Sequence, residues 1–90
     1  MARVSFTYAL KRFFPGIQTR EVDGSSVVEV LRELEAHYPG LSAYIVDDQG
    51  RLRKHVNIFV NNALINDKEA LSDTVKEGDE IYFMQALSGG

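Results

Sequence analysis

The residues best suited to chemistry are the last four, Leu87, Ser88, Gly89 and Gly90. Glycine lacks a Cβ atom, so a diglycine segment passes through narrow channels and adopts backbone angles that other residues avoid. Gly90 carries the terminal carboxylate. We therefore expect residues 87–90 to form a flexible tail that delivers this carboxylate into the active site of another protein. The alternative is a diglycine end without a function.

Side chains suited to a conventional catalytic or metal site are few. His37 and His55 have no paired spacing, and Asp47, Asp48 and Asp67 lack the graded spacing of a calcium loop. No glycine-rich phosphate loop occurs. The absence of cysteine excludes disulfides, thiolate metal sites and cysteine nucleophiles. We therefore expect no catalytic residue, no metal and no bound cofactor in this chain.

Composition indicates one small globular domain. The chain has 90 residues, of which 44% are hydrophobic and 26% charged, enough for one core but not for two. Its net charge of -3 argues against nucleic acid as a partner, because phosphate binding needs a basic surplus. No apolar segment approaches the roughly 20 residues of a membrane span, and residues 1–4 lack the apolar core of a signal peptide. We therefore expect a cytoplasmic protein with no nucleic-acid or membrane partner.

Basic residues nevertheless gather in two places. Lys11 and Arg12 are adjacent, and a denser group lies within residues 51–55. This denser group comprises Arg51, Arg53, Lys54 and His55. We interpret each group as part of a solvated loop; a docking patch for an acidic partner is the alternative.

Alternation of apolar and polar residues predicts two N-terminal strands. Val4, Phe6 and Tyr8 alternate with polar residues in the first strand. A loop over residues 10–16, which ends in a Pro-Gly turn signal, leads to a weaker strand at about residues 17–22. Together these segments predict an N-terminal hairpin with a long loop.

A helix is predicted over residues 27–38. Ser26 and Glu29 match a capping box, in which the two side chains satisfy free amide groups of the first turn, and Ser25 is the alternative cap. Pro39-Gly40 ends the helix. The apolar residues that form one stripe at helical spacing are Val27, Val30, Leu31, Leu34 and Tyr38.

The second half of the chain predicts three further strands. A short helical turn at residues 41–46 precedes a strand over residues 55–61. Asn61-Asn62 suit a tight turn into a short return strand at residues 63–65, because asparagine tolerates positive φ. The last strand covers residues 80–86. The turn-rich stretch before it contributes Leu71 and Val75 to the core.

This order of elements predicts an α+β fold with a mixed sheet of four to five strands and one main helix packed on one face. If the last strand returns beside the first, the two run parallel and a right-handed crossover is favoured. That arrangement is the β-grasp, or ubiquitin-like, fold, one of several small α+β folds that the pattern allows. We predict a β-grasp domain at residues 1–86 and a tail at residues 87–90.

The terminal Gly89-Gly90 follows the segment Gly78-Asp79-Glu80-Ile81 across one short strand. In this spacing the end of the chain resembles the C-terminal signature of the ThiS/MoaD family of sulfur-carrier proteins. The segment RKHVNIFVN, residues 53–61, resembles the middle strand of that family and is most similar to its CysO-like branch, which supplies sulfur for cysteine synthesis. One departure is Met84-Gln85-Ala86, where many members carry a proline.

The resemblance implies a protein that is a substrate and carrier, not an enzyme. A partner related to ubiquitin-activating enzymes would adenylate the Gly90 carboxylate, and that partner would use the ATP. A sulfur-donor protein or sulfide would then displace AMP and leave a thiocarboxylate, which an acceptor enzyme of cysteine, molybdopterin or thiamine biosynthesis would consume. Gly89 would provide clearance, and Ser88 and Leu87 would set the reach of the tail.

Phe59 and Met84 are the candidate partner-binding residues of the domain. Their strand parity is opposite to that of the predicted core residues, so we expect them to face outward beside the tail. The alternative is that they cover a second small core or pack under the long loop at residues 41–54. Phe13 and Phe14 raise the same question, and we interpret them as anchors of their loop.

Two other functions stay open at this point. A ubiquitin-like modifier would use the same activated Gly90 to form an isopeptide bond with a lysine. A β-grasp interaction domain without catalysis or carrier chemistry would have a terminal diglycine of no consequence.

Overall fold

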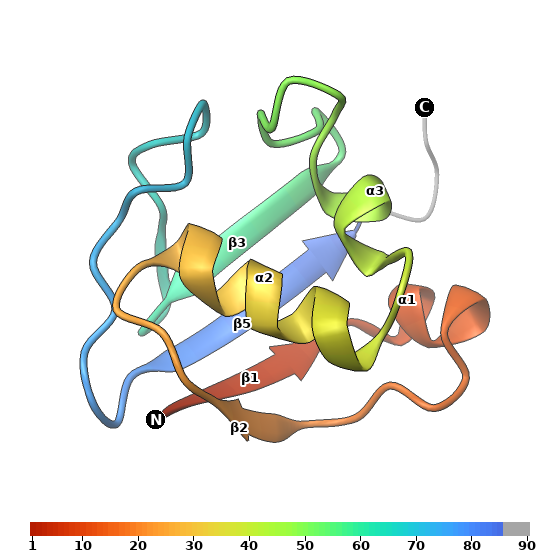
Figure 1. Ribbon diagram of the computed structural model, residues 1–90, viewed down its shortest axis with the longest axis horizontal. Helices are drawn as coiled ribbons and strands as arrows, with labels where there is room; N and C mark the ends of the chain where they lie inside the picture. The colour runs from red at the N-terminus through yellow and green to blue at the C-terminus, as the bar shows by residue number, and fades with distance from the viewer. Residues whose placement is uncertain (86–90) are drawn as a thin grey trace.

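The computed structural model describes residues 1–85, which form a five-stranded mixed sheet with helices on one face (Figure 1). The strand order is β2-β1-β5-β3-β4. β5 lies in the middle, parallel to β1 and antiparallel to β3. The strands are β1 (Ala2–Phe6), β2 (Arg20–Val22), β3 (Val56–Val60), β4 (Ala63–Leu64) and β5 (Glu80–Gln85), and the helices are α1 (Tyr8–Phe13), α2 (Val27–His37) and α3 (Leu41–Ile45).

The parallel pairing of β1 with β5 confirms the predicted β-grasp topology. Val4 lies opposite Ile81, and Phe6 lies opposite Phe83. The chain between these strands passes through α2, the main helix, which crosses one face of the sheet (Figure 1). The domain boundary predicted at residue 86 falls outside the described residues.

The core lies between α2 and the sheet. On β5, Ile81 and Phe83 are buried while Tyr82 between them is exposed, as alternation along a strand requires. Complete burial of an apolar side chain of this size contributes about 1.5–3 kcal/mol. The buried residues that α2 presents to the sheet are Val27, Val30, Leu31 and Leu34, as predicted.

Polar side chains fix both ends of α2. Ser26 Oγ accepts a hydrogen bond from the Glu29 amide at 3.3 Å, whereas the Glu29 carboxylate accepts from the amide of Ser25 at 2.9 Å. Both serines therefore take part in the cap. At the other end, the Glu35 carboxylate accepts from the amides of Gly40 and Ser42, each at 2.8 Å, and so joins α2 to α3.

The N-terminal prediction is wrong in two respects. Tyr8 is not a strand residue but begins α1, and its side chain is 77% exposed. The predicted loop over residues 10–16 is largely this helix, which buries Ala9 and Leu10. Six residues are too few for a helical stripe to show in the sequence. The second strand is also shorter than predicted, because Ile17 is buried ahead of β2 and not within it.

The elements predicted for the second half are observed with slightly shorter bounds for β3 and β4, and residue 86 of the predicted last strand lies outside the described residues. α3 lies where a helical turn was expected, and Asn61 and Asn62 turn the chain into β4 with φ of 51° and 71°. The Asn61 side chain holds this turn to the start of β5: it donates to Asp79 at 2.9 Å and accepts from the Glu80 amide at 2.9 Å. The buried residues of the following stretch are Ile65, Leu71 and Val75.

Candidate functional site

The end of β5 is the point from which the C-terminal residues continue. The Thr7 amide donates to the Phe83 carbonyl at 3.0 Å, and the Gln85 amide donates to Thr7 Oγ1 at 3.1 Å. On the other side of β5, Gln85 pairs with Val56 of β3. The last described residue, Gln85, is therefore held by both neighbouring segments.

The predicted tail residues Leu87, Ser88, Gly89 and Gly90 lie outside the described residues. Gly90 is five residues beyond Gln85 in the sequence. Since an extended chain spans at most about 3.6 Å per residue, the Gly90 carboxylate can act no more than about 18 Å from the end of β5. A partner that uses this carboxylate must therefore bind against the surfaces that border this end of the sheet.

The first such surface is apolar and lies on the face of the sheet opposite to α2. Phe59 pairs with Tyr82 on β5 and with Leu64 on β4. The ring centroids of Phe59 and Tyr82 are 6.4 Å apart. Leu64 is 49% exposed and Tyr82 is 37% exposed, whereas Phe59 and Met84 are half-buried. We name this surface the sheet-face patch; it consists of Phe59, Leu64, Tyr82 and Met84.

Two members of the sheet-face patch are the predicted candidates. Phe59 and Met84 lie on the face opposite to the buried Ile58 and Phe83, as their parity predicted. Tyr82 was missed although it shares its parity with Met84. Leu64 was missed because only the pairing of β3 with β4 places it beside Phe59. The role of these residues in partner binding stays a prediction.

The aromatic residues of α1 and its C-terminal end form a separate group with α3. Tyr44 stacks on Phe13 with ring centroids 4.9 Å apart and meets Phe14 edge-on at 5.3 Å. Phe14 packs against the core, so it anchors its segment as predicted. Phe13 is 52% exposed and is held mainly by Tyr44.

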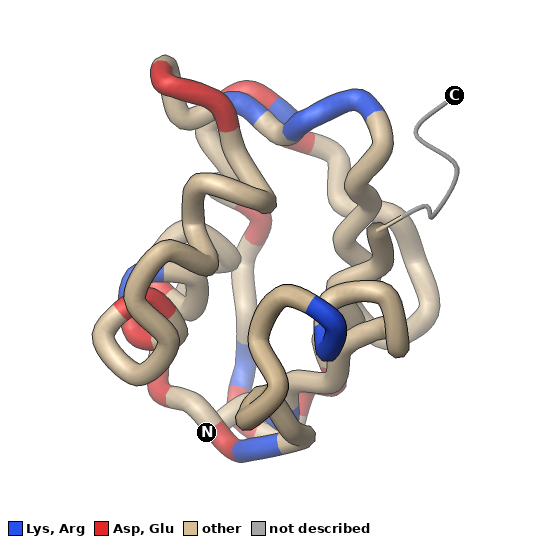
Figure 2. Tube along the Cα trace, turned by 90° about the vertical axis from the view of Figure 1, so that its right-hand side faces the viewer, with Lys and Arg blue, Asp and Glu red and all other residues tan. Residues whose placement is uncertain are grey.

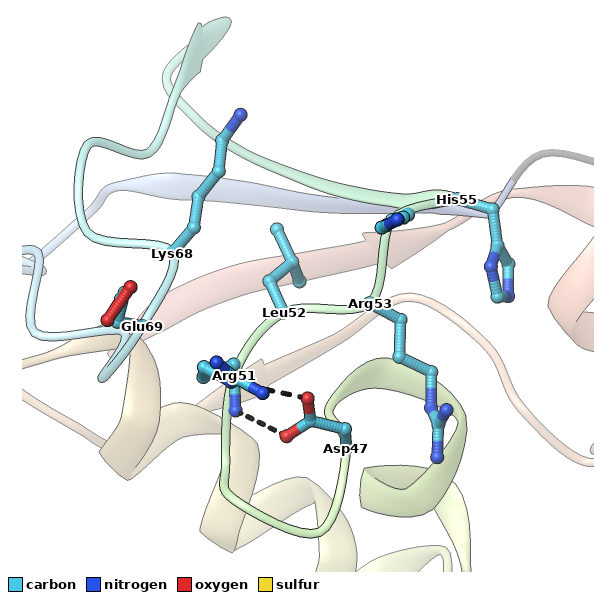
Figure 3. Close-up of a pocket in the computed structure, with 8 residues that line it drawn as sticks. Asp47, Arg51, Leu52, Arg53, His55, Lys68 and Glu69 are labelled. Carbon is cyan, nitrogen blue, oxygen red and sulfur yellow. Dashed lines mark hydrogen bonds and ion pairs between the residues drawn. The ribbon is translucent and has the colours of Figure 1, made fainter.

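The second surface beside the end of β5 is a shallow pocket of about 550 Å³ on the side of α3 (Figure 3). It combines the loop before β3, where Lys and Arg follow one another (Figure 2), with two residues of the stretch after β4. We name it the basic pocket. Its lining residues are Asp47, Arg51, Leu52, Arg53, Lys54, His55, Lys68 and Glu69.

Asp47 organises one wall of the basic pocket. Its carboxylate accepts from the amides of Arg51 and Gln49 at 3.0 and 2.9 Å, and it pairs with the Arg51 side chain at 3.4 Å. The hydrogen bond from the Arg51 amide, followed by that from Gln49 and by the Arg51 charge, holds the pKa of Asp47 below its ordinary value. The loop is therefore closed around an ionised carboxylate at neutral pH.

Within residues 1–85, no three side chains of His, Cys, Asp or Glu lie close enough together to hold a metal ion. Neither α1, α2 nor α3 is long and apolar enough to cross a bilayer. His37 is the last residue of α2, whereas His55 lies in the turn before β3.

Comparisons with known proteins agree in pointing to one group. The model of the ThiS family matches residues 12–90. The sulfur carrier protein CysO of Mycobacterium tuberculosis is 29% identical over 89 residues, which cover 97% of this chain and 96% of that protein. Small archaeal modifier protein 3 of Haloferax volcanii is 31% identical over 74 residues, 82% of this chain and 79% of that protein. A chain in the crystal structure of the Amycolatopsis orientalis BexX/CysO complex superimposes with a TM-score of 0.85 at 26% identity, with full coverage of both chains.

Proposed function

This chain belongs to the ThiS family, and from that premise we propose that it is a sulfur carrier charged on the carboxylate of Gly90. One observation carries the proposal: the family match extends to residue 90 and so includes the terminal Gly89-Gly90. The relatives that are named as sulfur carriers align with almost the whole chain.

The proposed charging begins with an adenylating enzyme related to ubiquitin-activating enzymes. A carboxylate is a poor electrophile, because its charge is delocalised and oxide would be its leaving group. An oxygen of the Gly90 carboxylate attacks the α-phosphorus of ATP, pyrophosphate leaves, and an acyl-adenylate forms. This step replaces the poor leaving group by AMP.

Sulfur enters in the second step. An electron pair of hydrosulfide attacks the acyl carbon of Gly90, the bond from that carbon to the AMP oxygen breaks, and a thiocarboxylate remains. When the donor is a protein persulfide, the first product is an acyl disulfide, and a thiol must reduce it to release the thiocarboxylate. Gly89 contributes the absence of a side chain, which lets the reacting carbon enter a narrow site.

The sheet-face patch is the proposed binding surface for the adenylating enzyme. It includes Tyr82 and Met84 of β5, the strand that leads to the tail, and its two exposed side chains, Tyr82 and Leu64, lie on either side of Phe59. Tyrosine is among the residues most enriched at the hot spots of protein interfaces. A partner seated on this patch lies within the distance that the Gly90 carboxylate can reach.

The proposed destination of the sulfur is cysteine synthesis or a related pathway. The support is the similarity to proteins named CysO, both in sequence and in fold. A subunit of the Helicobacter pylori molybdopterin-converting factor complex matches at only 20% identity and supports the fold alone.

Intact-protein mass spectrometry tests the carrier proposal. The full chain is incubated with ATP, magnesium, sulfide and an adenylating enzyme that charges a known carrier. We expect a mass gain equal to the replacement of one oxygen by sulfur, located at Gly90. Gly90→Ala and deletion of Gly90 abolish the gain and leave the fold intact, whereas Ser88→Ala is charged normally. Full charging of the Gly90-deleted chain, or an unchanged mass of the full chain, overturns the proposal.

A second function is supported by the similarity to small archaeal modifier protein 3, which covers 82% of this chain. A lysine amine would attack the same acyl-adenylate, AMP would leave, and an isopeptide bond would join Gly90 to the lysine. Trypsin cleaves after Lys76, so a conjugated lysine would carry residues 77–90 as its remnant. Detection of that remnant in host-cell extract shows conjugation. If the extract contains the thiocarboxylated chain but no remnant, the function is restricted to sulfur transfer.

A further inference from the structure

The basic pocket concentrates positive charge in an acidic chain. Four Lys or Arg residues and two carboxylates line it, which leaves six basic and eleven acidic residues for the remainder. Of the four cations, Arg51 is paired with Asp47. Arg53, Lys54 and Lys68 have no carboxylate within ion-pair distance among residues 1–85. This surface therefore attracts anions although the chain as a whole repels them.

Backbone hydrogen bonds hold the two segments of the pocket together. The Leu52 amide donates to the Lys68 carbonyl at 2.8 Å, and the Arg53 amide donates to the Ile45 carbonyl at 3.0 Å. The Arg53 guanidinium also donates to the Ala43 carbonyl of α3 at 2.8 Å. Because these segments are already ordered, a ligand that binds them loses little free energy to ordering.

The pocket borders the end of β5 on the side away from the sheet-face patch. His55 directly precedes Val56, which pairs with Gln85. In Figure 3, His55 lies beside the start of β3, and Arg53 extends along α3. The two surfaces therefore flank the same end of the sheet from opposite sides.

The composition of the pocket favours dispersed carboxylates over a nucleotide. Asp47 and Glu69 place negative charge among the cations of its lining. A compact polyphosphate would meet these carboxylates, whereas acidic side chains spread over a protein surface can avoid them. Because the tail can reach only a limited distance from the end of β5, the pocket must stay close to the entrance of the partner's active site when Gly90 is inside it.

We propose that the basic pocket docks on an acidic rim around the entrance through which a partner enzyme admits the tail. The proposal rests on the carrier function, since it assumes that Gly90 enters a partner. The pocket would guide the tail by attraction at long range, and the sheet-face patch would supply most of the contact energy.

A titration with a hexaglutamate peptide, followed by amide NMR spectra of the full chain, tests the pocket directly. Lys54→Glu/Lys68→Glu removes two exposed cations whose side chains make no hydrogen bond within residues 1–85. Arg32→Glu/Lys76→Glu changes the net charge equally at exposed positions outside the pocket. We expect shifts at residues 51–55 and 68–69 in the wild type and the control, and their loss in the pocket variant. If the amide spectrum of the pocket variant shows that it is unfolded, Lys54→Gln/Lys68→Gln takes its place.

Three results of the titration overturn the proposal. The first is no shift at millimolar peptide. The second is an equal response around Arg32 and Lys76, which shows unspecific attraction. The third is tighter binding of ATP or pyrophosphate than of the peptide at the same residues, which shows a phosphate site. The same titration on the Gly90-deleted chain is independent of charging, so its outcome stands whether or not the carrier proposal survives.

The charging assay gives a second readout. With the pocket variant we expect the same final mass gain as in the wild type but an initial rate lower by about tenfold at low salt, since electrostatic steering acts on association. The deficit shrinks as salt is raised. Equal rates for the pocket variant and the control variant at all salt concentrations contradict the docking role. An absence of charging in every variant contradicts the carrier proposal instead.

Discussion

The two surfaces that border the end of β5 are built in different ways. The sheet-face patch comes from three paired strands, and its members meet because the pairing register places them opposite one another. The basic pocket comes from irregular segments. Hydrogen bonds in turns and one β-bridge between Val46 and Leu52 hold these segments in place. One surface is apolar and the other is charged. An apolar patch slows dissociation once contact is made, whereas a charged pocket speeds association.

The substitution that we expect to destabilise the chain most lies in the core beneath the sheet-face patch. Phe83 is fully buried on β5 and stacks on Phe6 with ring centroids 5.8 Å apart. Phe83→Ala removes that ring from the core and lowers the free energy of unfolding by about 3–5 kcal/mol, measured by urea denaturation. Tyr82→Ala, the adjacent residue on the outer face, is the matched control and costs well under half as much. Equal losses would mean that the two faces of β5 are not buried differently in solution.

The next effect separates the two surfaces in a binding experiment. Tyr82→Ala truncates the most exposed aromatic side chain of the sheet-face patch, and we expect weaker binding to the adenylating enzyme by about 30-fold, as for an interface hot spot of about 2 kcal/mol. The loss lies in the dissociation rate and changes little with salt. Glu80→Ala, an exposed residue of the same strand and face, serves as the control.

The basic pocket should differ from the sheet-face patch in the rate constant that it controls. The pocket variant Lys54→Glu/Lys68→Glu changes the association rate and depends strongly on salt. If Tyr82→Ala instead gives a salt-dependent loss in the association rate, the division of roles between the two surfaces is wrong.

The sequence predicted those features that regular periodicity encodes. The stripe of α2 and the alternation of β5 each span enough residues for a repeat to show, so the core and the outward side of Phe59 and Met84 followed from parity. The helix α1 was missed because six residues give no repeat, and Tyr8 continued the alternation of β1 by chance. Sequence patterns thus failed where an element had too few residues for its repeat to be seen.

The surfaces could be predicted only in part, for the same physical reason. Leu64 joins Phe59 through strand pairing, and Lys68 joins Arg51 through the fold of two separate loops. The sequence placed Arg51 to His55 together because they are neighbours along the chain, and we interpreted them as a solvated loop. Their junction with Lys68 is a tertiary contact, which no spacing along the chain reports.

The smallest expected effect concerns the wall of the basic pocket that carries Lys68 and Glu69. The Asp67 carboxylate accepts hydrogen bonds from the Ser72 hydroxyl and from the amides of Ala70 and Glu69, the last two at 3.0 Å. The Ser72 hydroxyl, followed by these amides, lowers the pKa of Asp67 from 3.8 to about 2. The sheet-face patch contains no carboxylate, so acid should loosen the pocket before it affects the patch.

The sign of the pH effect follows from linkage. A carboxylate with a lower pKa in the folded chain stabilises the fold fully above its unfolded value of 3.8, and this contribution is lost as the pH falls toward 2. Asp67→Asn therefore makes the decline in unfolding free energy between these pH values shallower, measured by urea denaturation at each pH. Asp48→Asn, at an exposed site without a side-chain hydrogen bond within residues 1–85, leaves the slope unchanged. If the two variants give the same slope, Asp67 does not hold the pocket wall, and the order imposed on Lys68 must come from the Leu52 amide alone.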